Sequence, residues 1–245
     1  MLNEGAVAGN WRLSTRSVVN LVRSQVYNTE RRPLFAGYVC RDAARRAGSS
    51  SKSREIVFRT RRIRGRSQHP APPCIDIERV DKLTILGVLV NNNLTATDHV
   101  STVLASCASL MYALRVLRGH GLSEQSLKDV FQATVVGKLL YCAPAWSGFC
   151  SAADCTRLNS FLRRCDKLGY MEKHHADIST TFQEADDALF RTLSNISHFL
   201  HTYLSERPET AYSLRTRSHN KLLIPKTSDL GDRHFIIRSL YKNLY

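Results

Sequence analysis

The stretch Asp81-Lys82-Leu83-Thr84-Ile85-Leu86-Gly87-Val88-Leu89-Val90 decides the fold, because it separates a basic, irregular region from a region of helical periodicity. The run is short and almost wholly apolar, and the polar cluster Asn91-Asn92-Asn93 follows it. Such a run is typical of a buried strand. Gly87 predicts a bend that divides the run into a pair of strands. A glycine that merely relieves crowding in a small sheet is the alternative.

Apolar residues recur every three or four positions after this run, which predicts amphipathic helices. The stripes cover residues 100–117, 127–142, 155–168 and 178–200. Pro144 is expected to end the second helix, and Ser151 to Asp154 resembles a capping box at the start of the third. The first three helices have short connections, so we expect them to pack as a small bundle.

These patterns predict a mainly α chain of the α+β class, in which a short β-hairpin precedes a helical bundle. Upstream of the hairpin, Glu55 to Phe58 is expected to form a short strand. The chain is expected to divide into four parts. These are an N-terminal segment that is poorly ordered or unrelated to the rest of the chain, a pair of strands, a three-helix bundle, and a C-terminal helical and basic tail. Their bounds are 1–48, 49–93, 94–170 and 171–245.

The charge balance is unusual: 35 Lys and Arg against 21 Asp and Glu give a net charge of +14. This excess favours a polyanionic partner, most simply RNA or DNA, with an anionic membrane surface as the lesser option. No stretch approaches the roughly 18 apolar residues that span a bilayer, so no membrane-embedded segment is expected. Seven cysteines without a recognisable secretory signal indicate reduced thiols inside the cell, in the nucleus or the cytoplasm.

Two basic surfaces are candidates for contact with nucleic acid. Residues 41–66 carry ten basic and two acidic side chains, and the outer face of the third helix carries four more cations. Arginine suits phosphate because it directs two N–H donors at one group. A solvated loop and a nuclear-localisation patch are alternatives for residues 41–66. The candidate residues are Lys52, Arg54, Arg59, Arg61, Arg62, Arg64, Arg66, Gly87, Arg157, Arg163, Arg164 and Lys167.

A zinc site is an alternative, because Cys142, Cys150, Cys155 and Cys165 precede His174 and His175. Their spacings differ from those of common zinc modules, and several of the cysteines fall on apolar stripes. Cys150, His174 and His175 would be its ligands. Trp146 is expected to anchor the core, with base stacking as the alternative.

Lys52-Ser53-Arg54-Glu55-Ile56-Val57-Phe58, a connector and then Leu86-Gly87-Val88 resemble the end of the reverse-transcriptase palm in non-LTR (LINE-like) retrotransposons. In that family a Lys-Ser pair before an apolar strand is one palm motif, and a Leu-Gly-Val strand pair forms the primer grip. The helices that follow, with Pro144-Ala145-Trp146 and Arg163-Arg164, are similar to the thumb and the region after it. The resemblance covers residues 49–245.

The resemblance implies a thumb-like bundle that binds nucleic acid without performing polymerisation. The metal-binding aspartates of the family would precede Ser49, and residues 1–48 do not resemble palm sequence. No cofactor is expected, because Mg²⁺ belongs to the intact parent polymerase. Lys52 matches a palm lysine that protonates the pyrophosphate leaving group in the family. A helical protein-interaction module and a small zinc-binding protein are the alternative functions.

Ala185-Asp186-Asp187 resembles the catalytic triplet of reverse transcriptases, in which aspartates on a β-hairpin hold two metal ions. Here the triplet falls within a helical period and Ala185 lies on the apolar face. We therefore expect Asp186 and Asp187 to lie on the solvated side of a helix, without a catalytic role.

Overall fold

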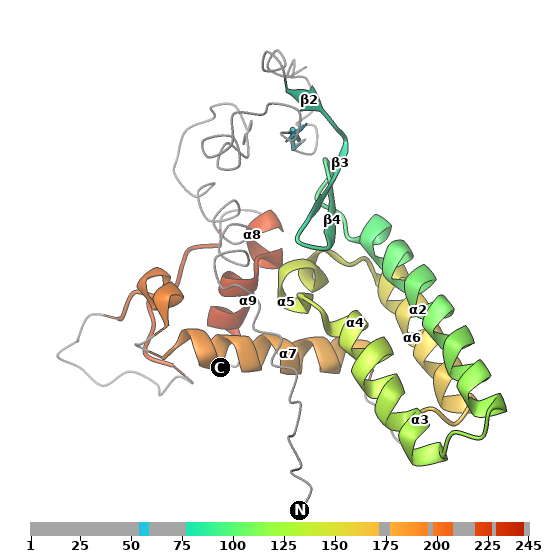
Figure 1. Cartoon of the computed structure of the whole chain (residues 1–245). Helices are drawn as coiled ribbons and strands as arrows, with labels where there is room; N and C mark the ends of the chain where they lie inside the picture. Colours follow the sequence, from blue (N-terminus) through green and yellow to red (C-terminus); the bar gives the residue numbers. More distant parts are fainter. Residues whose placement is uncertain are drawn as a thin grey trace, which may run out of the picture.

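The computed structural model describes residues 54–58, 77–171, 177–195, 198–207, 219–226 and 229–242. The described chain is mainly helical, and a small β-hairpin precedes the helices (Figure 1). This confirms the expected fold class. The segment 1–48 lies outside the described residues, so its expected order stays a prediction.

Two short pairs of strands precede the helices. β1 (Arg54–Glu55) pairs in parallel with β2 (Glu78–Arg79), and β3 (Lys82–Ile85) pairs antiparallel with β4 (Val88–Asn91). The expected strand over residues 55–58 is therefore shorter and begins one residue earlier. The bend in the apolar run is confirmed, but the expectation of a buried strand is wrong for β3, whose residues are exposed or half-buried. A two-stranded hairpin packs one face on the helices and leaves the other open.

The backbone conformation of the hairpin turn explains why a glycine occupies position 87. Leu86 and Gly87 connect Ile85 to Val88 with φ angles of 51° and 84°. Two consecutive positive φ angles define the two-residue turn whose twist matches that of the flanking strands. Gly87 adopts this conformation without a steric penalty. Leu86 has a Cβ, so its left-handed conformation costs about 1–2 kcal/mol.

Three helical rods form the bundle. α2 (Thr97–Gly119) is the longest, α3 (Glu124–Phe131) continues through a π-helical turn at Gln132–Val136 into α4 (Gly137–Leu140), and α6 (Ala152–Lys167) completes the set. α2 and α6 run parallel, because the N-terminal end of α2 contacts that of α6 and the C-terminal ends also contact each other. Thr97 donates to Asp154 across 2.9 Å at one end, and Arg118 donates to the Leu168 carbonyl across 2.8 Å at the other.

The second rod ends earlier than the sequence predicts. Its last helical residue is Leu140, and Cys142 takes a left-handed φ of 52°. Pro144 instead lies in the first turn of α5 (Ala143–Trp146), where its missing N–H has no helical partner to lose. The expectation that Pro144 ends the second helix is therefore wrong, and the proline begins the next one.

A second hydrophobic cluster lies beyond the bundle. α7 (Ile178–Leu193) runs beneath α5 and α9 in Figure 1, and a short 3-10 helix, Phe199–Tyr203, follows it. α8 (Asp229–Arg233) and α9 (Phe235–Tyr241) close this part. Its buried residues are Leu193, Leu204, Phe235, Ile236 and Leu240. The helix expected over residues 178–200 therefore ends at Leu193.

α2 has the length and composition of a membrane-spanning helix, although the sequence predicts no such segment. Its most apolar window of 18 residues has a mean hydropathy of 1.6, and 22% of that window is buried. A core helix can meet the same criterion. Val100, Cys107 and Leu114 of α2 are indeed buried in the bundle core.

Candidate nucleic-acid interface

The outer face of α6 carries exposed cations. Leu158, Leu162 and Cys165 are buried on one side of the helix, and Arg163, Arg164 and Lys167 are exposed on another. Among the described residues, none of these three cations forms an ion pair, whereas ten other lysines and arginines do. We call Arg163, Arg164 and Lys167 the α6 triad. These cations remain available to an anionic partner.

Arg157, the fourth predicted cation of α6, has a different environment. Its guanidinium lies 3.5 Å from the Asp154 carboxylate and donates to the hydroxyl of Ser101 in α2 across 3.0 Å. Burial raises the pKa of Asp154, but hydrogen bonds from Ser151 and Thr97 outweigh it, so the pKa lies below its usual value. Asp154 is therefore a carboxylate that partly neutralises Arg157, and Arg157 links α6 to α2.

The start of α6 explains how this face is fixed. Ser151 Oγ accepts from the Asp154 N–H across 3.2 Å, and the Asp154 carboxylate accepts from the Ser151 N–H across 3.1 Å. The predicted capping box is thus confirmed. Because the cap sets where the helix begins, it also sets which side chains of α6 face outward.

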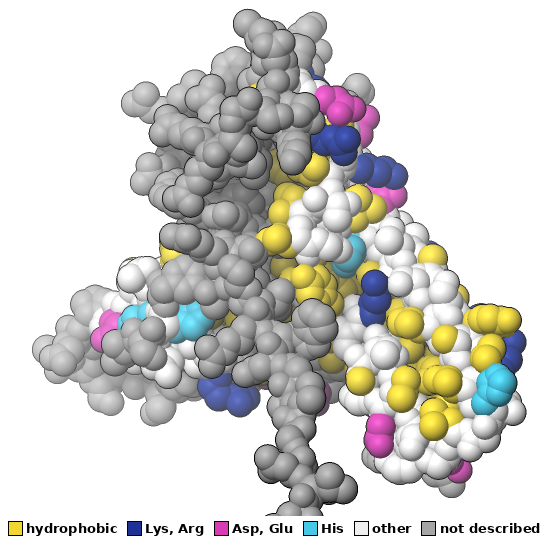
Figure 2. Space-filling model, in the orientation of Figure 1, with side chains coloured by type: hydrophobic (Ala, Val, Ile, Leu, Met, Phe, Trp, Pro, Cys, Tyr) yellow, Lys and Arg dark blue, Asp and Glu magenta, His cyan; other side chains and the backbone are white. Residues whose placement is uncertain are grey.

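The far end of α2 adds one cation, Arg118, and exposed apolar side chains near the end of α6. Arg118 donates to the Leu168 carbonyl, and its guanidinium lies 4.1 Å from the centre of the Tyr170 ring. Tyr112 is 68% exposed, so its ring is free to contact a partner. Figure 2 shows hydrophobic side chains at the surface over the lower ends of α2 and α3. The exposed apolar residues of this end are Tyr112, Val116, Leu117, Leu122 and Leu168.

Outside α6, Arg54 is the predicted cation that the structure describes, and it contributes little to this surface. Arg54 forms an exposed ion pair with Glu78 at 3.2 Å. Lys52, Arg59, Arg61, Arg62, Arg64 and Arg66 lie outside the described residues, so their role stays a prediction.

Gly87 lies on a different side of the bundle from the α6 triad. The hairpin turn lies beside the loop after α4, where Tyr141 donates to the Leu86 carbonyl across 3.0 Å. A Cβ added at Gly87 would lie 3.2 Å from Cε1 of Tyr141. α6 lies behind α2 in Figure 1, away from this turn. The structure therefore does not bring Gly87 and the α6 triad together.

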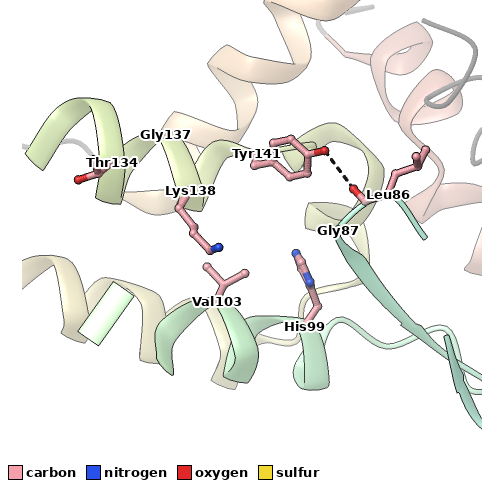
Figure 3. A pocket seen from close by; sticks show the side chains of 8 residues that line it. All are labelled: Leu86, Gly87, His99, Val103, Thr134, Gly137, Lys138 and Tyr141. Carbon is pink, nitrogen blue, oxygen red and sulfur yellow. Dashed lines mark hydrogen bonds between the residues drawn. The ribbon is translucent and has the colours of Figure 1, made fainter. Parts of the chain in front are cut away.

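A cavity of about 410 Å³ lies between the hairpin turn, α2 and the rod that continues into α4 (Figure 3). Its walls include Gly87, His99, Thr134, Lys138 and Tyr141. Thr134 belongs to the π-helical turn, and such turns often occur at functional sites. No motif in the sequence predicts this site. Thr134, Lys138 and Tyr141 share one helical face, but their spacing alone indicates no particular chemistry.

His99 is the buried polar residue of the cavity. Its Nδ1 accepts a hydrogen bond from the Leu89 N–H across 3.2 Å, which leaves the proton of the neutral ring on Nε2. Burial lowers the pKa of His99, and the nearby charge of Lys138 lowers it further. The ring is therefore neutral at pH 7. In Figure 3 its distal edge points toward Tyr141 and Gly87.

One aromatic and two acidic residues that the sequence singles out have structural roles. Trp146 is 3% exposed, packs edge-on against Phe182 at 5.2 Å and donates to the Tyr141 carbonyl, so it is a core anchor and cannot stack on a base. Asp186 is buried against Arg238, which corrects its expected position on the solvated side of the helix. Its neighbour Asp187 is half-buried and pairs with Lys242 at 2.7 Å.

The zinc alternative gains no support from the described residues. They contain no group of three or more His, Cys, Asp or Glu side chains that could hold a metal ion. Burial raises the pKa of the Cys150 thiol to about 12, which opposes the thiolate that zinc requires. His174 and His175 lie outside the described residues, so a site that includes them stays a prediction.

Searches against protein-family models, curated proteins and solved structures found no match to this chain. The resemblance to non-LTR reverse transcriptases therefore rests on the motifs quoted from the sequence.

Proposed function

We propose that this chain corresponds to the palm-edge strands and thumb of a non-LTR retrotransposon reverse transcriptase, and that it binds RNA or DNA through the phosphate backbone. The binding is sequence-independent and salt-sensitive, because exposed cations and phosphates attract each other without reading base edges. In this proposal the chain has no polymerase activity of its own.

The α6 triad is the observation that carries the proposal. Its three cations are exposed and form no ion pair with a described residue, although the charge of Arg163 helps to lower the pKa of Asp177. Arg118 and the exposed ring of Tyr112 lie at the same end of the bundle. Exposed cations and an exposed aromatic ring at the same end of a bundle suit a single strand, since phosphates bind the cations and bases stack on rings. The order of hairpin, long helix and bundle also fits the order that the resemblance implies.

The contacts of Asp186 and Asp187 support the proposal that this triplet has no catalytic role. A two-metal site needs carboxylates that converge on the ions. Here the two carboxylates are bound to Arg238 and Lys242 on α9 and lie within α7, not on a hairpin. The triplet that resembles a catalytic motif is therefore part of a helix–helix contact.

The test compares the affinity of three proteins for a labelled single-stranded oligonucleotide by fluorescence anisotropy at low salt. The first is the wild type, the second has Arg163, Arg164 and Lys167 all changed to Gln, and the third has the ion-paired cations Lys128 and Lys226 changed to Gln. We expect the α6 variant to bind at least about tenfold more weakly. Equal affinity of the wild type and the α6 variant would refute the proposal.

A protein-interaction module is the second candidate function, favoured by the exposed apolar end of α2. Tyr112, Val116 and Leu117 are large side chains that an isolated soluble bundle would normally cover. The two functions predict different behaviour in size-exclusion chromatography without nucleic acid. A stable oligomer that binds no oligonucleotide would favour the interaction module, and a monomer that binds one would favour the first proposal.

A further inference from the structure

The cavity between the hairpin turn and α4 contains hydrogen-bond donors and a cation that the proposed function does not use. Lys138 is exposed, forms no ion pair with a described residue, and directs its ammonium group toward the space between Val103 and Tyr141 (Figure 3). Among the described residues that line the cavity, none is acidic. The cavity therefore favours an anion.

His99 supplies a second donor from the buried side. Because Nδ1 accepts from the Leu89 N–H, the neutral ring presents N–H at Nε2. The edge-on contact with Trp146, at 4.8 Å between ring centres, holds the imidazole in place. Gly87 lies in the wall of the cavity, and its amide donates no hydrogen bond to a described residue. A positioned set of donors beside a cation is typical of phosphate recognition.

The size and the remaining walls limit what the anion can be attached to. A volume of about 410 Å³ falls within the range of small-molecule sites and greatly exceeds that of a single phosphate. Val103, Leu86 and the ring of Tyr141 give the remaining space an apolar and partly aromatic lining. Thr134 donates its own proton to the Val130 carbonyl at 2.6 Å, so its oxygen remains an acceptor for a ligand hydroxyl.

We infer that this cavity binds a phosphate ester that carries a flat organic group, as a nucleoside monophosphate does, with Lys138 and His99 as the phosphate donors. Such a group can come from a free nucleotide or from a nucleotide within a chain, and both share the chemistry that the cavity recognises. The inference does not rest on the proposed function, because no member of the α6 triad lines the cavity.

The test uses the full chain with the α6 triad changed to Gln, so that the basic face of α6 does not contribute. Adenosine monophosphate and adenosine are titrated by calorimetry, and the ring signals of His99 are followed by NMR. We expect the monophosphate to bind and to shift the His99 signals, and adenosine to bind at least about tenfold more weakly, since it lacks the charged acceptor.

Two further variants locate the binding energy. Lys138→Gln should weaken the monophosphate about tenfold and leave adenosine unchanged, whereas the control Lys128→Gln should change neither. The inference is overturned if the monophosphate does not bind, if adenosine binds equally well, or if Lys138→Gln has no effect in a variant that keeps its melting temperature. If a single-stranded oligonucleotide displaces the bound monophosphate, the site binds nucleotides within a nucleic-acid chain. If the oligonucleotide does not displace it, the site binds free nucleotides.

Discussion

The carboxylate of Asp186 in α7 lies 2.7 Å from Nε and 2.9 Å from Nη2 of Arg238 in α9, a two-pronged ion pair. The same guanidinium donates to the carbonyls of Pro144 and Arg233 and to the hydroxyl of Ser147. One arginine thus joins the end of the chain to α7 and to the segment around α5. This contact explains why an acidic residue lies on the buried side of α7.

Removal of Asp186 should destabilise the protein far more than removal of Asp187. The side chains of Asp186 and Arg238 are only 12% and 21% exposed, so Asp186→Ala leaves a poorly hydrated guanidinium and should cost about 3 kcal/mol. Asp187 and Lys242 are 46% and 30% exposed, and Asp187→Ala should cost less than about 1 kcal/mol. Urea denaturation measures both values. Equal costs would argue against the role assigned to Arg238.

A methyl group at Gly148 should disrupt the same contact. An added Cβ would lie 2.1 Å from Nη1 of Arg238 and 2.2 Å from the carbonyl oxygen of Arg233, so Gly148→Ala should cost about 2 kcal/mol or more. The matched control is Gly119→Ala at the end of α2, where nothing lies within 4 Å of the added Cβ. That change should be neutral or stabilise by up to about 1 kcal/mol. Thermal denaturation of both variants compares them, and a stabilising Gly148→Ala would contradict the structure.

Gly87 should be more sensitive to substitution than Gly121, although both have a positive φ. The left-handed conformation alone makes either change to Ala cost about 1–2 kcal/mol. At Gly87 the added Cβ would also approach Tyr141 at 3.2 Å, whereas at Gly121 it meets nothing within 4 Å. The difference in the free energy of unfolding between the two variants isolates the contact with Tyr141. A larger cost at Gly121 would show that the turn does not lie against that ring.

His99 should make stability depend on pH. Burial and then the charge of Lys138 lower its pKa below the ordinary value of 6.5, so the unfolded chain binds the proton more readily. The contribution of neutral His99 is therefore complete above pH 6.5 and declines as the pH falls from 6.5 to the lowered pKa. His99→Asn, which keeps an acceptor for the Leu89 N–H, should flatten this decline. An unchanged pH profile of the free energy of unfolding would contradict the assignment.

The helices were predictable because their signal is local. The apolar stripe that begins at Val100 and the capping box at Ser151 need only neighbouring residues. The capping box is confirmed, and the stripe is confirmed as far as Leu114, whereas Leu117 is exposed. Pro144 was misassigned because its restricted φ suits the start of a helix as well as the residue after one. The π-helical turn at Gln132–Val136 has no pattern of its own in the sequence.

The sites depend on contacts between distant segments, which no local pattern reveals. The partner of Asp186 lies 52 residues downstream, so no local pattern predicts that Asp186 is buried. The cavity combines His99 of α2 with Lys138 of α4 and Gly87 of the hairpin, and only the packed bundle brings them together. The exposed cations of α6 are predictable, because the apolar stripe of a helix shows which residues lie on the opposite face. The contacts of Arg157 with Asp154 and Ser101 are not predictable in this way.

The salt dependence of oligonucleotide binding tests the central claim most directly. If the α6 triad neutralises three phosphates of a single strand, its replacement by Gln should reduce the slope of the logarithm of the association constant against the logarithm of salt concentration by about 2. The variant with Lys128 and Lys226 changed to Gln should keep the wild-type slope, because ion pairs already occupy those cations. A slope that is the same in the wild type and the α6 variant would contradict the account.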